Sequence, residues 1–149
     1  IPYDAFCGCE ALDSIQLHEG ITSIGSSAFS GTAIKQITIP STVTSIDGYA
    51  FSDCFALKSI VIPDSVTYLG YDAFSYCTAL ESVTLPSGLT DIPNSCFEDC
   101  TTLSSIEIPE SVTHIESRAF QNCTSLSEAT IPESTRSIGY NAYVAHSTG

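Results

Sequence analysis

Apolar residues recur along this chain in a pattern that repeats about every 23 residues. The units begin at Leu12, Ile34, Leu57, Leu80, Leu103 and Leu126. The first step is 22 residues long and the next four are 23 residues each. A unit of this size cannot bury its own apolar face, so successive units have to stack on one another. The period therefore predicts a solenoid.

Each unit opens with two apolar residues that flank one variable residue, and proline follows in most units. The unit from Leu57 has Ile60 and Ile62 before Pro63. This alternation indicates a strand with one buried face. Because proline has no N–H to donate, the strand should be short and should end there.

Two further apolar positions follow in each unit, and an Ala-Phe pair comes after them. In the same unit these are Val66 and Leu69, then Ala73 and Phe74, with Cys77 three residues later. We expect Val66 and Leu69 to lie in a second extended segment, which is less regular than the first one. The Ala-Phe pair predicts a short helical or turn segment whose Phe and Cys point inward.

The tandem motif L-x-x-I-x-I-P-x-S-V-T-x-I-x-x-x-A-F-x-x-C-x-x-L covers nearly the whole chain. It resembles the BspA-like, or treponemal-type, leucine-rich repeats. The resemblance implies a right-handed leucine-rich-repeat superhelix of about six 23-residue coils, with short parallel strands joined by short helical or turn segments. It also implies display at the cell surface or secretion, and adhesion to host proteins or other cells.

We expect a single solenoid domain over residues 1–149. Its predicted parts are a partial coil at 1–11, repeats at 12–33, 34–56, 57–79, 80–102 and 103–125, and a degenerate last coil at 126–149. The chain starts without methionine and halfway through a coil, which indicates a mature form or a piece of a longer array. In the last coil Ala129, Thr135, Tyr143 and His146 replace the usual column residues. Such a coil fits either a natural capping repeat or an artificial end of the chain.

The net charge of the chain limits the classes of molecule that it can bind. The chain has 17 Asp and Glu against four Lys and Arg, and a formal net charge of -13. A surface of this sign repels phosphate backbones and anionic lipids, so we expect no nucleic-acid partner. The chain has no run of about 18 apolar residues, so we expect no membrane insertion.

Five cysteines share one column of the repeat and are expected to form a buried structural ladder of mostly reduced thiols, because free Cys behaves as a small hydrophobe. They are Cys9, Cys54, Cys77, Cys100 and Cys123. A zinc site would need four converging ligands, and only Cys7 and Cys9 come near that spacing. Neighbouring thiols in the ladder should sit slightly beyond disulfide range.

The candidate catalytic groups are dispersed by the repeat. His18, His114 and His146 fall in three different columns, whereas a catalytic histidine needs a nucleophile and an orienting partner beside it. The sequence contains no G-x-S-x-G elbow, phosphate-binding P-loop or H-E-x-x-H motif. Glu110 and Glu133 are the best of several weak cation candidates. We therefore expect a protein that is not an enzyme, with no metal site and no cofactor.

Columns that stay constant between coils should form the core, so binding specificity should lie in columns that vary. The outward column of the second segment reads Ser45, Tyr68, Asp91, His114 and Ser137. Tyr68, Asp91 and His114 in successive coils are the candidate ligand-binding residues, and Tyr71 and Tyr76 would add exposed aromatic area. Simple variation of surface residues is the alternative explanation.

Two hypotheses about function follow. The first is a non-catalytic extracellular or cell-surface module for adhesion that binds a protein or glycan on another cell or in the matrix. The second is a structural spacer or display stalk within a larger surface protein or multi-enzyme complex. A recognition face should carry a contiguous patch that does not repeat, whereas a spacer should be uniformly polar.

Overall fold

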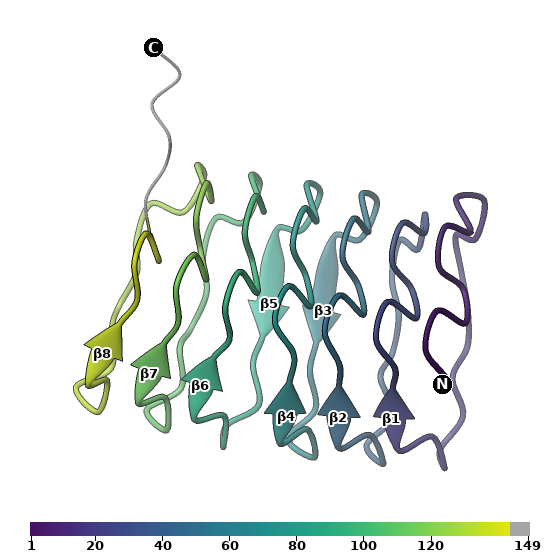
Figure 1. Ribbon diagram of the computed structural model, residues 1–149, viewed down its shortest axis with the longest axis horizontal. Coiled ribbons are helices and arrows are strands. Elements are labelled where there is room, and N and C mark those ends of the chain that lie inside the picture. Colours follow the sequence, from purple (N-terminus) through teal and green to yellow (C-terminus); the bar gives the residue numbers. More distant parts are fainter. Residues whose placement is uncertain (144–149) are drawn as a thin grey trace.

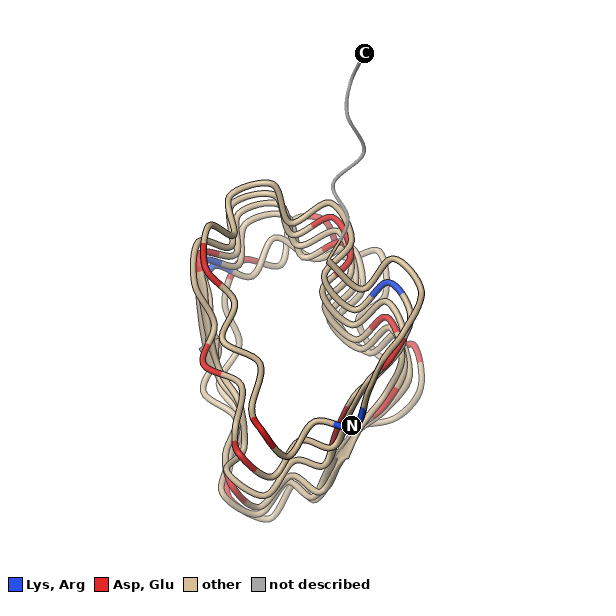
Figure 2. Ribbon diagram, turned by 90° about the vertical axis from the view of Figure 1, so that its left-hand side faces the viewer, with Lys and Arg blue, Asp and Glu red and all other residues tan. Residues whose placement is uncertain are grey.

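The structure is a computed structural model that describes residues 1–143, and it winds them into a row of stacked coils (Figure 1). Viewed along the row, the coils superimpose as one elongated ring, with the acidic residues spread around its outside (Figure 2). The described part contains the strands β1 (Ser23–Ile24), β2 (Ser45–Ile46), β3 (Ser59–Val61), β4 (Tyr68–Leu69), β5 (Ser82–Thr84), β6 (Asp91–Ile92), β7 (His114–Ile115) and β8 (Ser137–Ile138). All of their pairings are parallel.

The second segment of each coil is the more regular one, so the expectation that it would be less regular is wrong. It carries β1, β2, β4, β6, β7 and β8, while the first segment carries only β3 and β5. Backbone donors flank the buried residue of the second segment, as where Thr67 N donates to Thr44 O at 2.9 Å and Gly70 N to Ile46 O at 2.8 Å. The proline that ends the first segment removes one such donor from most coils.

Threonine side chains reinforce the second segment. The hydroxyls of Thr44, Thr67 and Thr113 donate to the backbone carbonyl of the equivalent residue in the preceding coil, at 3.2, 3.4 and 3.3 Å. A β-branched residue suits an extended backbone, and here its hydroxyl also links two coils. Each of these threonines therefore stabilises the stack as well as its own strand.

The sheet of the second segment is interrupted between β4 and β6. The strands form one group in the order β1-β2-β4 and another in the order β6-β7-β8. At the position after the buried strand residue, Glu116 N donates to Ile92 O at 2.9 Å. The equivalent residue in the coil of β6 is Pro93, which has no N–H and cannot make this bond.

The Ala-Phe segment consists of turns, not of a helix. Its N–H groups alternate in direction: Phe51 N donates to Ala73 O of the next coil at 2.8 Å, whereas Ser52 N donates to Tyr49 O of its own coil at 3.1 Å. The residues two positions before and after the Phe have a left-handed backbone, as in Tyr49 and Asp53 with φ of 60° and 57°. This alternation gives every coil a row of hydrogen bonds to its neighbour.

Aromatic rings form a continuous stack through the core. The stacked rings are those of Phe6, Phe29, Phe51, Phe74, Phe97, Phe120 and Tyr143, with centroids 5.0 to 5.6 Å apart and interplanar angles from 0° to 17°. Tyr143, which replaces Phe in the last coil, continues the stack. Ile138, in the last of the described coils, is exposed. His146, another replacement predicted there, lies outside the described residues.

We expect Phe74→Ala to lower the free energy of unfolding by about 3–5 kcal/mol, because it removes a ring enclosed by two others and leaves a cavity. Phe55→Ala is the matched control, since the Phe55 side chain is 50% exposed and its loss should cost less than about 1 kcal/mol. Urea unfolding followed by circular dichroism measures both. Equal losses in the two variants would contradict a stability that depends on the ring stack.

Candidate functional site

The structure brings together two of the three residues of the row predicted from the sequence. Tyr68, Asp91 and His114 lie on β4, β6 and β7 with exposed side chains. Asp91 and His114 pair in register, and their Oδ1 and Nδ1 atoms lie 3.3 Å apart. β4, which carries Tyr68, does not pair with β6, so the sheet does not fix Tyr68 in register with this pair.

Neighbouring hydroxyls orient the Asp91–His114 pair. Thr90 Oγ1 donates to Asp91 Oδ2 at 2.7 Å, and Thr113 Oγ1 lies 2.8 Å from His114 Nδ1. The side chains of Asp91 and His114 are 51% and 47% exposed, and an ion pair in such a setting contributes little to folding stability. The pair is therefore available as a polar feature of the surface.

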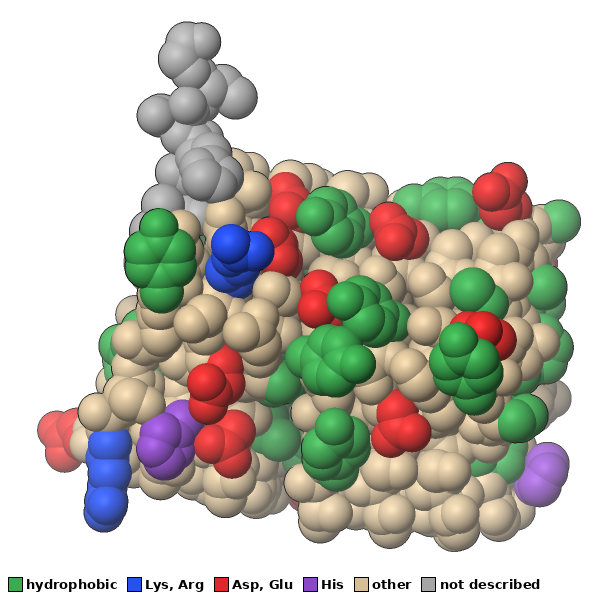
Figure 3. Space-filling model, in the orientation of Figure 1, with side chains coloured by type: hydrophobic (Ala, Val, Ile, Leu, Met, Phe, Trp, Pro, Cys, Tyr) green, Lys and Arg blue, Asp and Glu red, His purple; other side chains and the backbone are tan. Residues whose placement is uncertain are grey.

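Tyr71 and Tyr76, the other predicted binding residues, belong to a larger aromatic surface. We call Tyr49, Tyr71 and Tyr76, which are 40%, 53% and 46% exposed, the tyrosine cluster. Tyr76 is linked to the other two by its surroundings: burial raises its pKa, and the charges of Asp72 and Glu98 raise the pKa of both Tyr49 and Tyr76. The rings of Tyr49 and Tyr71 meet edge to face, with centroids 5.3 Å apart and an interplanar angle of 88°. Gly48 makes room for this contact, since a Cβ there would lie 3.1 Å from the Tyr71 ring. Figure 3 shows apolar and tyrosine side chains gathered in the middle of this face.

Carboxylates surround the tyrosine cluster. Asp53, Tyr76 and Asp99 occupy the same repeat position in three successive coils, linked by backbone bonds such as Tyr76 N to Glu98 O at 2.7 Å. Burial and then the charges of Glu98 and Asp99 raise the pKa of Tyr76. The charge of Asp72 raises the pKa of Tyr49. The cluster therefore lies in a negative field.

Tyr49 was missed by the sequence analysis, which compared the outward columns of the two extended segments only. Tyr49 lies in the turn segment, in the repeat column that holds Asp72 in the next coil. A comparison of the turn columns would have marked Tyr49 and Tyr76 as bulky residues among mostly small and polar ones. Its contact with Tyr71 was not readable from columns, because the two tyrosines occupy different ones.

The predicted cysteine column is buried in four coils. The thiols of Cys54, Cys77, Cys100 and Cys123 donate to the backbone carbonyl of the Phe in the preceding coil, at 3.0 to 3.1 Å. Cys9 departs from the expectation of a buried ladder: its side chain, in the first of the described coils, is exposed. Cys96, in the Ala-Phe column, is also buried, and all seven cysteines are free thiols.

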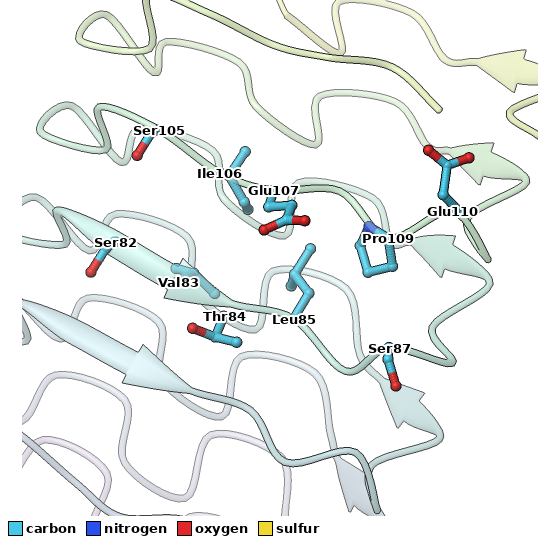
Figure 4. A pocket seen from close by; sticks show the side chains of 10 residues that line it. All are labelled: Ser82, Val83, Thr84, Leu85, Ser87, Ser105, Ile106, Glu107, Pro109 and Glu110. Carbon is cyan, nitrogen blue, oxygen red and sulfur yellow. The ribbon is translucent and has the colours of Figure 1, made fainter. Parts of the chain in front are cut away.

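The first segment presents shallow grooves where neighbouring coils are not paired. The groove between β5 and the next coil has a volume of about 500 Å³ and is lined by Thr84, Leu85, Glu107 and Pro109, among others (Figure 4). Glu110 lies at its edge. No group of three or more His, Cys, Asp or Glu side chains in residues 1–143 is placed to hold a metal ion.

Catalytic residue types remain dispersed in the part of the chain that the structure describes. His18 lies near the start of the second segment, with Nδ1 3.0 Å from the backbone carbonyl of Glu19, whereas His114 is on β7. His146 lies outside the described residues. No helix within residues 1–143 is long and apolar enough to cross a membrane.

Comparisons with known proteins give a consistent picture. A family model described as the BspA type leucine rich repeat region matches six copies, over residues 1–103 and 45–148. The chain is similar to a leucine-rich repeat protein from Bacteroides ovatus, with 35% identity and a TM-score of 0.89 over 92% of this chain and 36% of that chain. It is also similar to the T. pallidum leucine rich repeat protein, with 33% identity and a TM-score of 0.88 over 93% of this chain and 65% of that one.

A third crystal structure, of a leucine-rich repeat protein from Eubacterium ventriosum, shows 29% identity and a TM-score of 0.69 over 87% of this chain and 42% of that chain. This chain thus spans between 36% and 65% of the length of these three relatives. No curated protein matches the chain.

The burial of the cysteines predicts their reactivity. In the folded protein, iodoacetamide should modify Cys7 and Cys9, which are exposed, and leave Cys54, Cys77 and Cys100 unmodified. Burial raises the pKa of Cys77 and Cys100 well above its usual value, so little nucleophilic thiolate forms there. Mass spectrometry of peptides from folded and urea-unfolded protein separates the two classes. Rapid labelling of Cys77 in the folded protein would contradict the buried column.

The same burial predicts a loss of stability at alkaline pH. Burial raises the pKa of Cys123 to about 12, whereas the thiol of an unfolded chain ionises near ~8.5. The unfolded state therefore releases a proton first, so the free energy of unfolding keeps its full value below that pH and falls as pH rises toward 12. Urea unfolding at a series of pH values should show a shallower fall in Cys123→Val. An identical fall in variant and unmodified protein would rule out this thiol as a cause.

Proposed function

Because the chain belongs to the BspA-type leucine-rich-repeat family, we propose that it is a non-catalytic recognition module. It is displayed at the cell surface or secreted, and it binds a protein or glycan on another cell or in the matrix. Leucine-rich-repeat modules generally bind proteins and carry out no catalysis. The location follows from the resemblance of the repeats to those of surface and secreted proteins.

The tyrosine cluster is the observation that carries this proposal. The side chains that build the stack recur from coil to coil, whereas Tyr49, Tyr71 and Tyr76 form a patch that occurs once along the described chain. Exposed aromatic residues cost solubility and are concentrated in binding interfaces. A spacer would gain nothing from such a patch, so its presence favours recognition.

The dispersal of catalytic residue types supports a module that does no chemistry. His18 and His114 lie in different columns, and Asp91 with His114 forms a pair of half-exposed groups. The buried thiols have their pKa raised by burial, as in Cys77, and are therefore poor nucleophiles. These features leave shape and surface chemistry as the means by which the protein acts.

A binding screen against glycans and extracellular-matrix proteins tests the proposal. We expect at least one ligand, and we expect Tyr71→Ala/Tyr76→Ala to weaken its binding by about tenfold or more if these residues lie at the centre of the contact. The matched control is Thr84→Ala/Glu107→Ala, which alters the exposed side of the first segment, on and beyond β5, behind the face of β4 and β7 in Figure 1.

Each outcome of the screen has a defined meaning. Loss of binding in the first variant alone supports recognition through this face. Loss in the control alone would keep recognition but move it to the grooves of the first segment. Binding that survives both variants would keep recognition but contradict the role of the tyrosine cluster. The absence of any ligand would contradict the proposal and favour a structural spacer.

A further inference from the structure

We propose that the tyrosine cluster, together with the carboxylates around it, binds a cationic segment of a protein, that is, a stretch with exposed arginine or lysine side chains. This inference rests on the proposed function and deepens it by naming the class of partner. Three observations carry it: the backbone positions of two tyrosines, the distribution of charge and the arrangement of the rings.

The first observation is that two of the tyrosines occupy left-handed positions. Tyr49 and Tyr76 have φ of 60° and 59°. Glycine, asparagine and aspartate adopt this conformation most easily, whereas bulky side chains are disfavoured there. In other coils the column of Tyr76 holds only such residues, namely Gly8, Gly31, Asp53, Asp99 and Asn122. The column of Tyr49 is less strict: it holds Asp4, Asp72 and Asn141, but also Ser27, Ser95 and the bulky Arg118.

The fold therefore does not require tyrosine at either position. The side chains of Tyr49 and Tyr76 are 40% and 46% exposed and lie outside the aromatic stack of the core. A residue that strains the backbone without filling the core is typical of a functional surface. Its contribution has to come from what its ring contacts outside the molecule.

The second observation is that negative charges predominate near the cluster. The pKa of Tyr76 is raised by burial and by the charges of Glu98, Asp99, Asp72 and Asp53. Within residues 1–143 the ion pair that the structure contains is that of Asp91 with His114, so none of these four carboxylates is in an ion pair with Lys or Arg. Arg118 acts on Asp72 from farther away: burial raises the pKa of this carboxyl group, and Arg118 lowers it to a smaller extent. The formal net charge of -13 adds a long-range field of the same sign. Such a surface attracts a cationic partner and repels an anionic one.

The third observation is the geometry of the rings. Tyr49 and Tyr71 stand at 88° to each other, so they form a corner and not the flat platform on which a sugar ring stacks. A guanidinium or ammonium group can lie over the face of a single tyrosine while it pairs with a carboxylate beside that ring. Tyr76 between Asp53 and Asp99 provides this combination.

The experiment is a titration of the ¹⁵N-labelled chain with a short peptide of alternating glycine and arginine, followed by heteronuclear NMR. The control peptide has citrulline in place of arginine, which keeps the shape and removes the charge. We expect the arginine peptide to shift the amide signals of residues 48–53, 71–76 and 94–99 more than those of the first segment. The citrulline peptide should bind at least several-fold more weakly.

The decisive variant is Tyr49→Asn/Tyr76→Asn, because asparagine already occurs in both columns, at Asn141 and Asn122. This variant should fold with unchanged or higher stability, so a loss of binding cannot be ascribed to unfolding. We expect its affinity for the arginine peptide to fall about five- to tenfold, at roughly two- to threefold or more for each ring. Tyr140→Asn, in a tyrosine near Arg118 in the last coil, is the matched control and should bind as the unmodified protein does.

A second pair of variants separates local from general charge. Glu98→Gln should lower the affinity for the arginine peptide. Glu107→Gln makes the same change on the first segment and should leave this affinity nearly unchanged. An equal loss of affinity in the two Glu→Gln variants would mean that the attraction is non-specific and would overturn the inference. Amide shifts spread evenly over all coils would do the same. If the citrulline peptide bound as tightly as the arginine peptide, or if a neutral glycan displaced the arginine peptide, the cationic partner would be ruled out. The proposed function would remain in place.

Discussion

The hydrogen bonds and ring contacts between successive coils are the interactions on which the whole structure depends. Within residues 1–143 every sheet is made of strands from different coils, and N–H groups such as that of Phe51 donate to the next coil, here to Ala73 O. The aromatic rings and the thiols of the cysteine column likewise find their partners in an adjacent coil. Stability is therefore a sum of contacts between neighbours, as in other repeat proteins.

This constraint separates the interior of the molecule from its surface. The interior must repeat, because each coil presents to the next the same surface that it receives from the one before. The outward side chains are free of that requirement, and local changes there leave the core intact. Pro93 interrupts the sheet between β4 and β6, yet Ile92 and Phe97 on either side of it remain fully buried.

The repeat period made most of the core predictable. Strand positions and the inward direction of Phe74 and Cys77 followed from the columns, since residues of one column are neighbours along the stack. Columns did not show that Cys9, which shares the column of the buried thiols, has an exposed side chain. They also could not show diagonal contacts, such as that of Tyr49 with Tyr71, because these depend on the path of the turn and on the space left by Gly48.

Positions whose residue type does not suit the local backbone conformation or burial are informative about function. Most columns hold residues that suit both their backbone conformation and their burial, which is the consistency expected of a sequence that specifies one fold. Tyr49 and Tyr76 break this consistency, as does Arg118, with bulky side chains on a left-handed backbone. Burial raises the pKa of Asp72, which lies next to Tyr49 along the stack, so the charged form of this carboxylate is also disfavoured by its surroundings. Several unfavourable choices in one small area of an otherwise regular stack need a common compensation, and contact with a partner outside the chain supplies one that the fold itself does not.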